Sequence, residues 1–265
     1  MNTAHQRPEV LSRLALVVTS LLALGVVAWP LLASAGNFSS QSAVVVSLVA
    51  MPALIIVLSL VLDSSLRNTT VLALVGVLAA LAAAARVVST GAGGFELVFV
   101  VVILAGRALG ARLGFVVGIL AIALSSLVWG GFGPWSAFQM LAVGWVGAGA
   151  GLLPHSGLVV PPARRWREVA MLAGYGVIAS YAFGLVMNLW FWPIALGPDT
   201  TLSLVDGGGP ADNTVRWLVY SLGSSTLTWD TVRALTTAVT LSLVGRPVLV
   251  ALRRVYDRSA TPKSI

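Results

Sequence analysis

The chain has 265 residues, of which 58% are hydrophobic and 9% are charged, whereas a soluble globular domain carries about 25% charged residues. A soluble protein of this composition would lack the polar surface that has to cover its core, so the sequence predicts an integral membrane protein. The net charge of +7 would suggest nucleic-acid binding in a soluble protein. In a membrane protein it first indicates orientation, and we expect no nucleic-acid partner.

Three scarce residue types exclude several kinds of site. The chain has no cysteine and only two histidines, His5 and His155, which excludes disulfides, cysteine-ligated zinc and a zinc-binding helix with two histidines. Its single lysine, Lys263, stands at the end of the chain and is not the lysine of a P-loop or of a buried Schiff base. Since the spans also contain no acid–base set, we expect neither an enzyme nor a bound cofactor or metal.

A helix needs about 20 apolar residues to cross the hydrocarbon core of a bilayer, or fewer if the residues at its ends are polar and reach the interface. By this criterion the chain contains eight candidate spans, at residues 14–34, 42–62, 69–88, 94–106, 113–129, 136–153, 168–192 and 227–246. The fourth and fifth are separated only by residues 107–112, so one broken element is the alternative. The eighth is the least hydrophobic because it contains Asp230 and Arg233.

The distribution of basic residues tests this layout, because lysine and arginine near span ends set orientation. With the N-terminus inside, 13 of the 16 basic residues fall on the inner side, and Arg86, Arg216 and Arg233 fall toward the outer half. The sequence therefore predicts an all-α, multi-pass protein of the cell membrane with eight spans and both termini in the cytoplasm.

The first predicted span has a competing interpretation. Arg7 and Arg13, the apolar run that follows and the small residues 33–35 resemble a signal peptide with its cleavage site. The apolar run from Leu14 to Leu32 is longer than the 7–15 residues usual in such peptides, which favours a retained helix.

One long outer connection is predicted, at residues 193–226. Pro198, the glycine–proline run 207–210 and three aspartates oppose a membrane span there. Residues 214–223 are compatible with a short amphipathic helix that lies on the membrane surface.

Small residues recur at four-residue spacing in several spans, as at Gly76, Ala80 and Ala84 in the third. Such stripes let helix backbones approach closely in lipid. They serve either packing within the protein or the docking of a partner membrane subunit, and the alanine-rich segment 79–85 is the strongest docking candidate.

Tryptophan is concentrated toward the predicted outer side, where seven of the nine rings fall. A membrane-interface belt would populate both sides, so some of these rings are candidates to line an outward-facing pocket, above all Trp135, Trp190 and Trp192. The amides of Gln139 and Asn188 lie nearby in sequence and cost free energy if they are buried without a partner. They are either structural clips or polar groups of that pocket.

Four charged residues fall within or near the predicted spans, namely Arg86, Glu96, Asp230 and Arg233. Because a charge in the membrane is costly, such residues are candidates for function. The simpler expectation is a salt bridge between Arg86 and Glu96 across the short segment 89–94.

Residues 70–192 carry an ordered set of motifs. These are Arg86, Gly94-Phe95-Glu96-Leu97, Gly106-Arg107, Leu109-Gly110-Ala111-Arg112-Leu113-Gly114-Phe115, Gly133-Pro134-Trp135, Phe138-Gln139-Met140, Gly144-Trp145-Val146-Gly147 and Gly151-Leu152-Leu153-Pro154. In this order they resemble the substrate-capture (S) components of energy-coupling factor (ECF) transporters, and more narrowly the actinobacterial-type members with an N-terminal extension.

The resemblance implies a six-helix S-component-like core at 69–252, preceded by a cytoplasmic tail at 1–13 and a two-helix extension at 14–62 and followed by a basic tail at 253–265. It implies a subunit that binds a vitamin-like small molecule from outside and associates in the membrane lipid with a coupling subunit and two ATP-binding subunits.

The residues that these interpretations single out fall into two sets. The candidate ligand-binding residues are Glu96, Trp135, Gln139, Asn188 and Trp192, and residues 193–226 are a candidate lid. By resemblance, the coupling-subunit docking face is Ala79, Ala80, Ala83 and Ala84. The alternative is a membrane scaffold or assembly protein that packs with partner helices and binds no solute.

Overall fold

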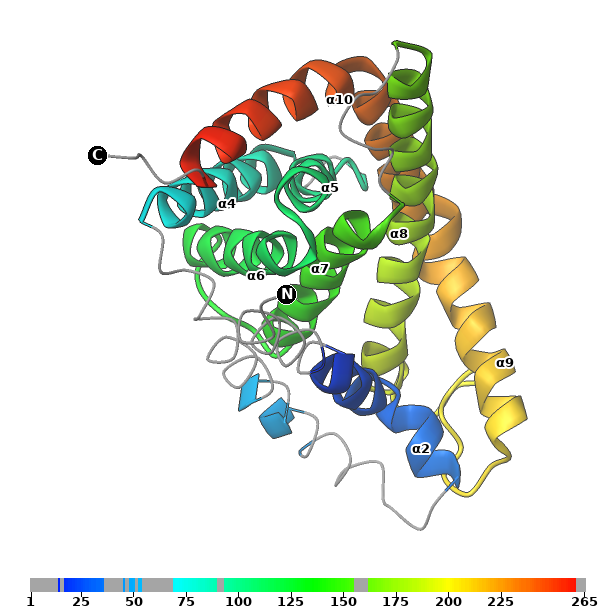
Figure 1. Ribbon diagram of the computed structural model, residues 1–265. Coiled ribbons are helices and arrows are strands. Elements are labelled where there is room, and N and C mark those ends of the chain that lie inside the picture. The colour runs from blue at the N-terminus through cyan, green and yellow to red at the C-terminus, as the bar shows by residue number, and fades with distance from the viewer. Residues whose placement is uncertain are drawn as a thin grey trace. The chain divides into compact units, whose positions relative to one another are not determined.

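The computed structural model describes residues 14, 17–35, 45, 48–50, 52–53, 69–89, 93–154 and 162–260, with the side chains of the last range at 166–258. Within these ranges the chain is helical and forms no β-strand (Figure 1). An apolar helix covers Val17–Val27. The remaining helices are α2 (Trp29–Ala35), α4 (Thr69–Ser89), α5 (Val98–Leu109), α6 (Ala111–Val128), α7 (Ser136–Leu152), α8 (Pro162–Leu196), α9 (Pro210–Ser221), the π-helix η2 (Leu222–Asp230) and α10 (Thr231–Ala260).

Four helical segments in the described part of the chain are long and apolar enough to cross a membrane. They are Thr69–Ser89, Ala111–Val128, Trp166–Leu196 and Pro210–Arg258, and three shorter apolar helices accompany them at Val17–Val27, Val98–Leu109 and Ser136–Leu152. The protein is therefore a helical protein suited to a membrane. The count of eight spans stays a prediction, because the second predicted span, 42–62, lies almost entirely outside the described residues.

The fourth and fifth predicted spans are separate helices. Helix α5 ends at Leu109 and α6 begins at Ala111. Gly110 between them has φ of 94°, a left-handed conformation that glycine adopts without steric cost. One glycine therefore reverses the chain between the two helices.

The described helices belong to two compact units. Unit 1 comprises residues 1–67 and 186–222, and unit 2 comprises residues 68–185 and 223–265. The core of unit 2 is α5, which packs against α4, α6, α7 and α10 and buries ten of its residues, including Phe99, Ile103 and Arg107.

The packing of α5, α6 and α7 depends on glycines, which have no side chain, at the points where the helix backbones meet. A Cβ atom at Gly106 would overlap the backbone carbonyl of Gly147, and one at Gly114 would overlap the backbone of Gly106. Close approach of helix backbones through small residues is a common way to associate helices in lipid. The stripes in these three helices therefore serve packing within the protein, which was one of the two predicted uses.

Tryptophans join segments of the described part of unit 1. The indole Nε1–H of Trp29 donates to the carbonyl of Trp190 over 3.2 Å, and that of Trp192 donates to the carbonyl of Leu202 over 2.7 Å. All three side chains are buried. In these contacts the rings tie the end of α8 to α2 and to the chain that follows α8.

The connection that follows the seventh predicted span is shorter than predicted. Helix α8 continues through Pro193 to Leu196, and α9 begins at Pro210, so only residues 197–209 of the predicted connection 193–226 lie outside helices. Pro193 stands in the last turn of α8 and lacks the N–H that would donate to the carbonyl of Leu189, so the helix continues without that one hydrogen bond. From Pro210 to Arg258 the chain is one helical run of 49 residues.

Candidate functional site

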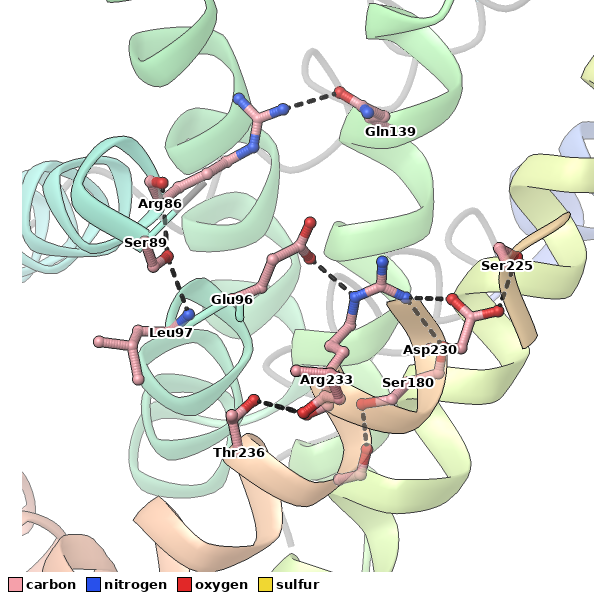
Figure 2. Close-up of polar contacts among 12 residues, drawn as sticks. Arg86, Ser89, Glu96, Leu97, Gln139, Ser180, Ser225, Asp230, Arg233 and Thr236 are labelled. Atoms are coloured by element: carbon pink, nitrogen blue, oxygen red, sulfur yellow. Dashed lines mark hydrogen bonds and ion pairs between the residues drawn. The ribbon is translucent and has the colours of Figure 1, made fainter. Parts of the chain in front are cut away.

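Arg233 is the centre of a polar network within unit 2 (Figure 2). Its Nε donates to Oε2 of Glu96 over 2.8 Å, and its Nη1 donates to Oδ1 of Asp230 over 2.6 Å and to the carbonyl of Ser180 over 3.2 Å. The residues come from the segment before α5, the end of η2, the first turn of α10 and the middle of α8. The network therefore connects three helices and the chain that enters a fourth.

The charges of this network are buried but compensated. The side chain of Asp230 is 1% exposed and that of Arg233 is 7% exposed, so each would be costly if it were alone. Ser225 Oγ donates to the second carboxylate oxygen of Asp230 over 2.9 Å. The guanidinium also lies over Phe99 and Phe183, 5.4 and 4.8 Å from the ring centroids, contacts that favour a cation.

Local backbone features position Asp230. It ends the π-helix η2, and π-helical segments are rare and frequent at functional sites. Its carboxylate lies against Gly184 of α8, where a Cβ atom would overlap the carboxylate oxygens. A glycine at 184 is therefore required for this placement of the ion pair.

Arg86 forms a second polar contact in the same region. Its Nη2 donates to Oε1 of Gln139 over 3.1 Å (Figure 2). Its Nη1 donates to Oγ of Ser125 over 2.9 Å. Gln139 thus has a side-chain partner from another helix, and that partner is a charged group.

The expected salt bridge between Arg86 and Glu96 is replaced by a different pairing. The ion pair of Glu96 is with Arg233, although Glu96 still acts on Arg86 through Coulomb attraction. The physical reason is the position of Arg233, which α10 brings from far along the chain to the carboxylate. The segment between Ser89 and Leu97 is closed by another contact: the backbone N–H of Leu97 donates to Oγ of Ser89 over 3.2 Å.

The five predicted ligand residues are divided between the units. Glu96, Trp135 and Gln139 lie in unit 2, and Asn188 and Trp192 lie in unit 1. Glu96 and Gln139 belong to the polar contacts around Arg233 and Arg86, and the side chain of Glu96 is 21% exposed.

Trp135 and Trp192 have different environments. Trp135 is an exposed ring at the start of α7, one turn before Gln139. Trp192 is fully buried, and its indole N–H donates a hydrogen bond to the carbonyl of Leu202.

The four predicted docking alanines lie on two faces of α4. Ala79 and Ala83 are buried, whereas Ala80 and Ala84 are exposed. Gly76 is also exposed, and a Cβ atom there would meet nothing within 4 Å. The small residues that α4 presents to its surroundings are therefore Gly76, Ala80 and Ala84.

A second ionic cluster in unit 2 was missed by the sequence reasoning. Oε1 of Glu168 accepts from Arg107 Nε over 2.6 Å and from Arg253 Nη2 over 2.5 Å. Arg107 also donates to the carbonyls of Leu153 and Pro154, over 2.8 and 3.0 Å. The signal was one glutamate directly after the arginines at 164, 165 and 167, in a chain with nine acidic residues in all.

Both clusters consist of ion pairs between arginine and carboxylate side chains. Among the described residues no group of three or more histidine, cysteine, aspartate or glutamate side chains could hold a metal ion. What the Arg233 network and the Arg86–Gln139 contact offer is a set of charged and amide hydrogen-bonding groups beside aromatic rings, within helices of membrane-spanning character.

Comparison with known proteins gives no relative: no family model, curated protein or solved structure matches the chain.

Proposed function

We propose that this chain is the substrate-capture (S) component of an ECF-type importer, a membrane-embedded subunit that binds a vitamin-like small molecule from outside the cell. The observation that carries the proposal is the group of partly accessible polar side chains at Glu96, Arg86 and Gln139 inside an apolar helical unit. Polar groups that converge in an otherwise apolar setting are the usual composition of a small-molecule site.

The chemistry of these groups suits a water-soluble ligand. Arg86 and Arg233 supply guanidinium donors, Glu96 supplies a carboxylate acceptor, and Gln139 supplies an amide. Trp135 adds an aromatic ring one turn before Gln139 on α7, and rings of this kind cover the faces of planar ligands. A ligand would exchange hydrogen bonds with groups that are already oriented by one another.

The proposal also requires partners, because the chain carries no P-loop lysine with which to bind ATP. A coupling subunit and two ATP-binding subunits would supply the energy. The exposed small-residue face of α4 at Gly76, Ala80 and Ala84 supports docking of a membrane partner there, since small residues allow close helix contact in lipid. In the proposed assembly the protein lies in the cell membrane with both termini in the cytoplasm.

The direct test is to purify the full chain from its native membrane and to identify the bound small molecule by mass spectrometry. We expect one vitamin-like compound, bound at sub-micromolar concentration. The Gln139→Ala variant should bind it more weakly, because Arg86 loses an orienting partner, whereas Trp129→Ala, a matched change at an exposed ring in unit 2, should bind it normally. Absence of any bound compound, or equal binding by both variants, contradicts the capture role at this site.

The scaffold alternative rests on the same exposed face of α4. Two separate measurements, co-purification of a partner and binding of a small molecule, distinguish it from the capture function. Ala80→Leu combined with Ala84→Leu should abolish co-purification of a membrane partner and leave ligand binding intact. If the unchanged protein binds no small molecule, and if this variant loses a membrane partner that the unchanged protein retains, the scaffold function is favoured.

A further inference from the structure

The end of unit 2 that holds Glu168 carries an excess of arginine on two adjoining segments, the start of α8 and the second half of α10. The basic residues there are Arg167, Arg246, Arg253, Arg254 and Arg258, against the acidic Glu168 and Asp257. The predicted span 168–192 begins beside Arg167, the predicted span 227–246 ends at Arg246, and the other basic residues follow the second of these spans. These charges therefore stand at span ends, where a membrane presents its headgroups.

Helices α8 and α10 run antiparallel where they contact each other. Glu168 is bound by Arg253 at one end, and the hydroxyls of Tyr181 and Thr231 lie 3.0 Å apart farther along. Trp166 and Arg246 belong to the same contact, and we call the surface around these two side chains the α8–α10 seam.

Arg246 has hydrogen-bonding capacity to spare. Its guanidinium carbon lies 5.7 Å from the centroid of the Trp166 ring, and that residue is 57% exposed. Within the described part of the chain the N–H groups of Arg246 donate no hydrogen bond. A guanidinium has five N–H donors in a fork that fits phosphate oxygens. The N–H groups of Arg246 are therefore able to donate hydrogen bonds to an anionic ligand.

The neighbouring ionic cluster does not neutralise the seam. Glu168 is shared by two arginines, Arg107 and Arg253, which leaves a positive charge in excess. Arg107 is 1% exposed and Arg253 is 37% exposed, so the excess charge is on the accessible side chain. Coulomb attraction for an anion at Arg246 is thereby increased.

Apolar surface continues from the charged end along the same face of α10. Leu243 and Val239 stand one and two turns before Arg246 and are exposed, and residues at such spacing share a helix face. A ligand with an anionic head and apolar chains would match both the basic end and the apolar surface. An acidic protein segment would match only the basic end.

We propose that an anionic phospholipid binds at the α8–α10 seam, with its phosphate on Arg246 beside Trp166 and its chains over Leu243 and Val239. The lipid then covers the seam of two helices that the Glu168 cluster already joins. This site is separate from the residues assigned above to ligand capture and does not depend on that proposal.

The test measures lipid binding to the purified full chain in neutral detergent by native mass spectrometry, with phosphatidylglycerol and phosphatidylcholine as probes. Phosphatidylglycerol should bind in preference. The Arg246→Gln variant should bind it about fivefold more weakly, as expected for loss of one basic residue at an anionic lipid. Arg258→Gln, which removes the same charge elsewhere on α10, should bind it nearly as the unchanged protein does.

Several results would overturn the proposal. Equal weakening by Arg246→Gln and Arg258→Gln would indicate diffuse attraction rather than a site, and equal binding of the two lipids would remove the role of the charge. Complete competition by inorganic phosphate would assign the site to a free anion, and competition by poly-glutamate without lipid binding would assign it to an acidic protein. If Arg246→Gln fails to fold, Arg246→Lys and Trp166→Ala serve instead, and both should weaken binding of phosphatidylglycerol.

Discussion

Replacement of Glu168 by glutamine should destabilise the protein far more than loss of its accessible partner. The carboxylate is bound by Arg107 over 2.6 Å and by Arg253 over 2.5 and 3.1 Å. Removing it leaves the guanidinium of Arg107, which is 1% exposed, as a buried charge without a counterion. Such a change costs about 3–5 kcal/mol, and we expect about 3 because the glutamine carbonyl still accepts a hydrogen bond.

The matched variant is Arg253→Gln, which removes the other cation but leaves the buried pair of Arg107 and Glu168 intact. Because Arg253 is 37% exposed, its contribution should be below about 1 kcal/mol. The assay is the free energy of unfolding in mixed detergent micelles, followed by circular dichroism. An equal decrease in the free energy of unfolding for the two variants would refute the argument that the fold depends on the buried ion pair of Arg107 and Glu168. A decrease below about 1 kcal/mol for Glu168→Gln would refute it as well.

Two further predictions use substitutions that add a methyl group (Gly→Ala) or an isopropyl group (Ala→Leu). Gly184→Ala places a methyl group on the Asp230 carboxylate and should lower the free energy of unfolding by about 1–3 kcal/mol; Gly174→Ala, where the methyl group meets open space, should be neutral or stabilise by up to about 1 kcal/mol. Ala79→Leu should overpack the inner face of α4 and lower the unfolding temperature, whereas Ala80→Leu on its exposed face should change stability by no more than about 0.5 kcal/mol. Thermal unfolding of each pair checks the sign, and an equal response within a pair contradicts the assigned faces.

The apolar helices could be predicted from the sequence, but their ends could not. Hydropathy located α4 almost to the residue, at 69–88 against Thr69–Ser89. For α8 it gave 168–192, whereas the helix covers Pro162–Leu196. Apolar counting detects the part of a helix that suits hydrocarbon, and the backbone hydrogen-bond ladder continues through polar turns beyond it. The sequence predicted a connection at 193–226 with a short helix at 214–223, whereas the chain is helical from Pro210 through α9 and η2 to Asp230.

The polar site was predicted in composition but not in pairing. Arg86, Glu96, Asp230 and Arg233 are conspicuous because charges are rare in apolar segments. Proximity in sequence suggested Arg86 as the partner of Glu96, but the tertiary packing of α10 brings Arg233 to it. Arg253 was interpreted only as an orientation signal, and Arg107 as an orientation signal and a member of the motif set, since no local pattern indicates that Glu168 binds both of them.

Helical continuity between η2 and α10 fixes the carboxylate of Asp230 on a continuous backbone. Within unit 2, residues 223–230 of η2 lead directly into α10 at Thr231, and no loop separates them. A change in the winding of this π-helical segment would therefore move the carboxylate of Asp230 relative to the guanidinium of Arg233, which stands one turn later. The hydrogen bond between these two side chains is thus a suitable position for a spectroscopic reporter of strain in the helix.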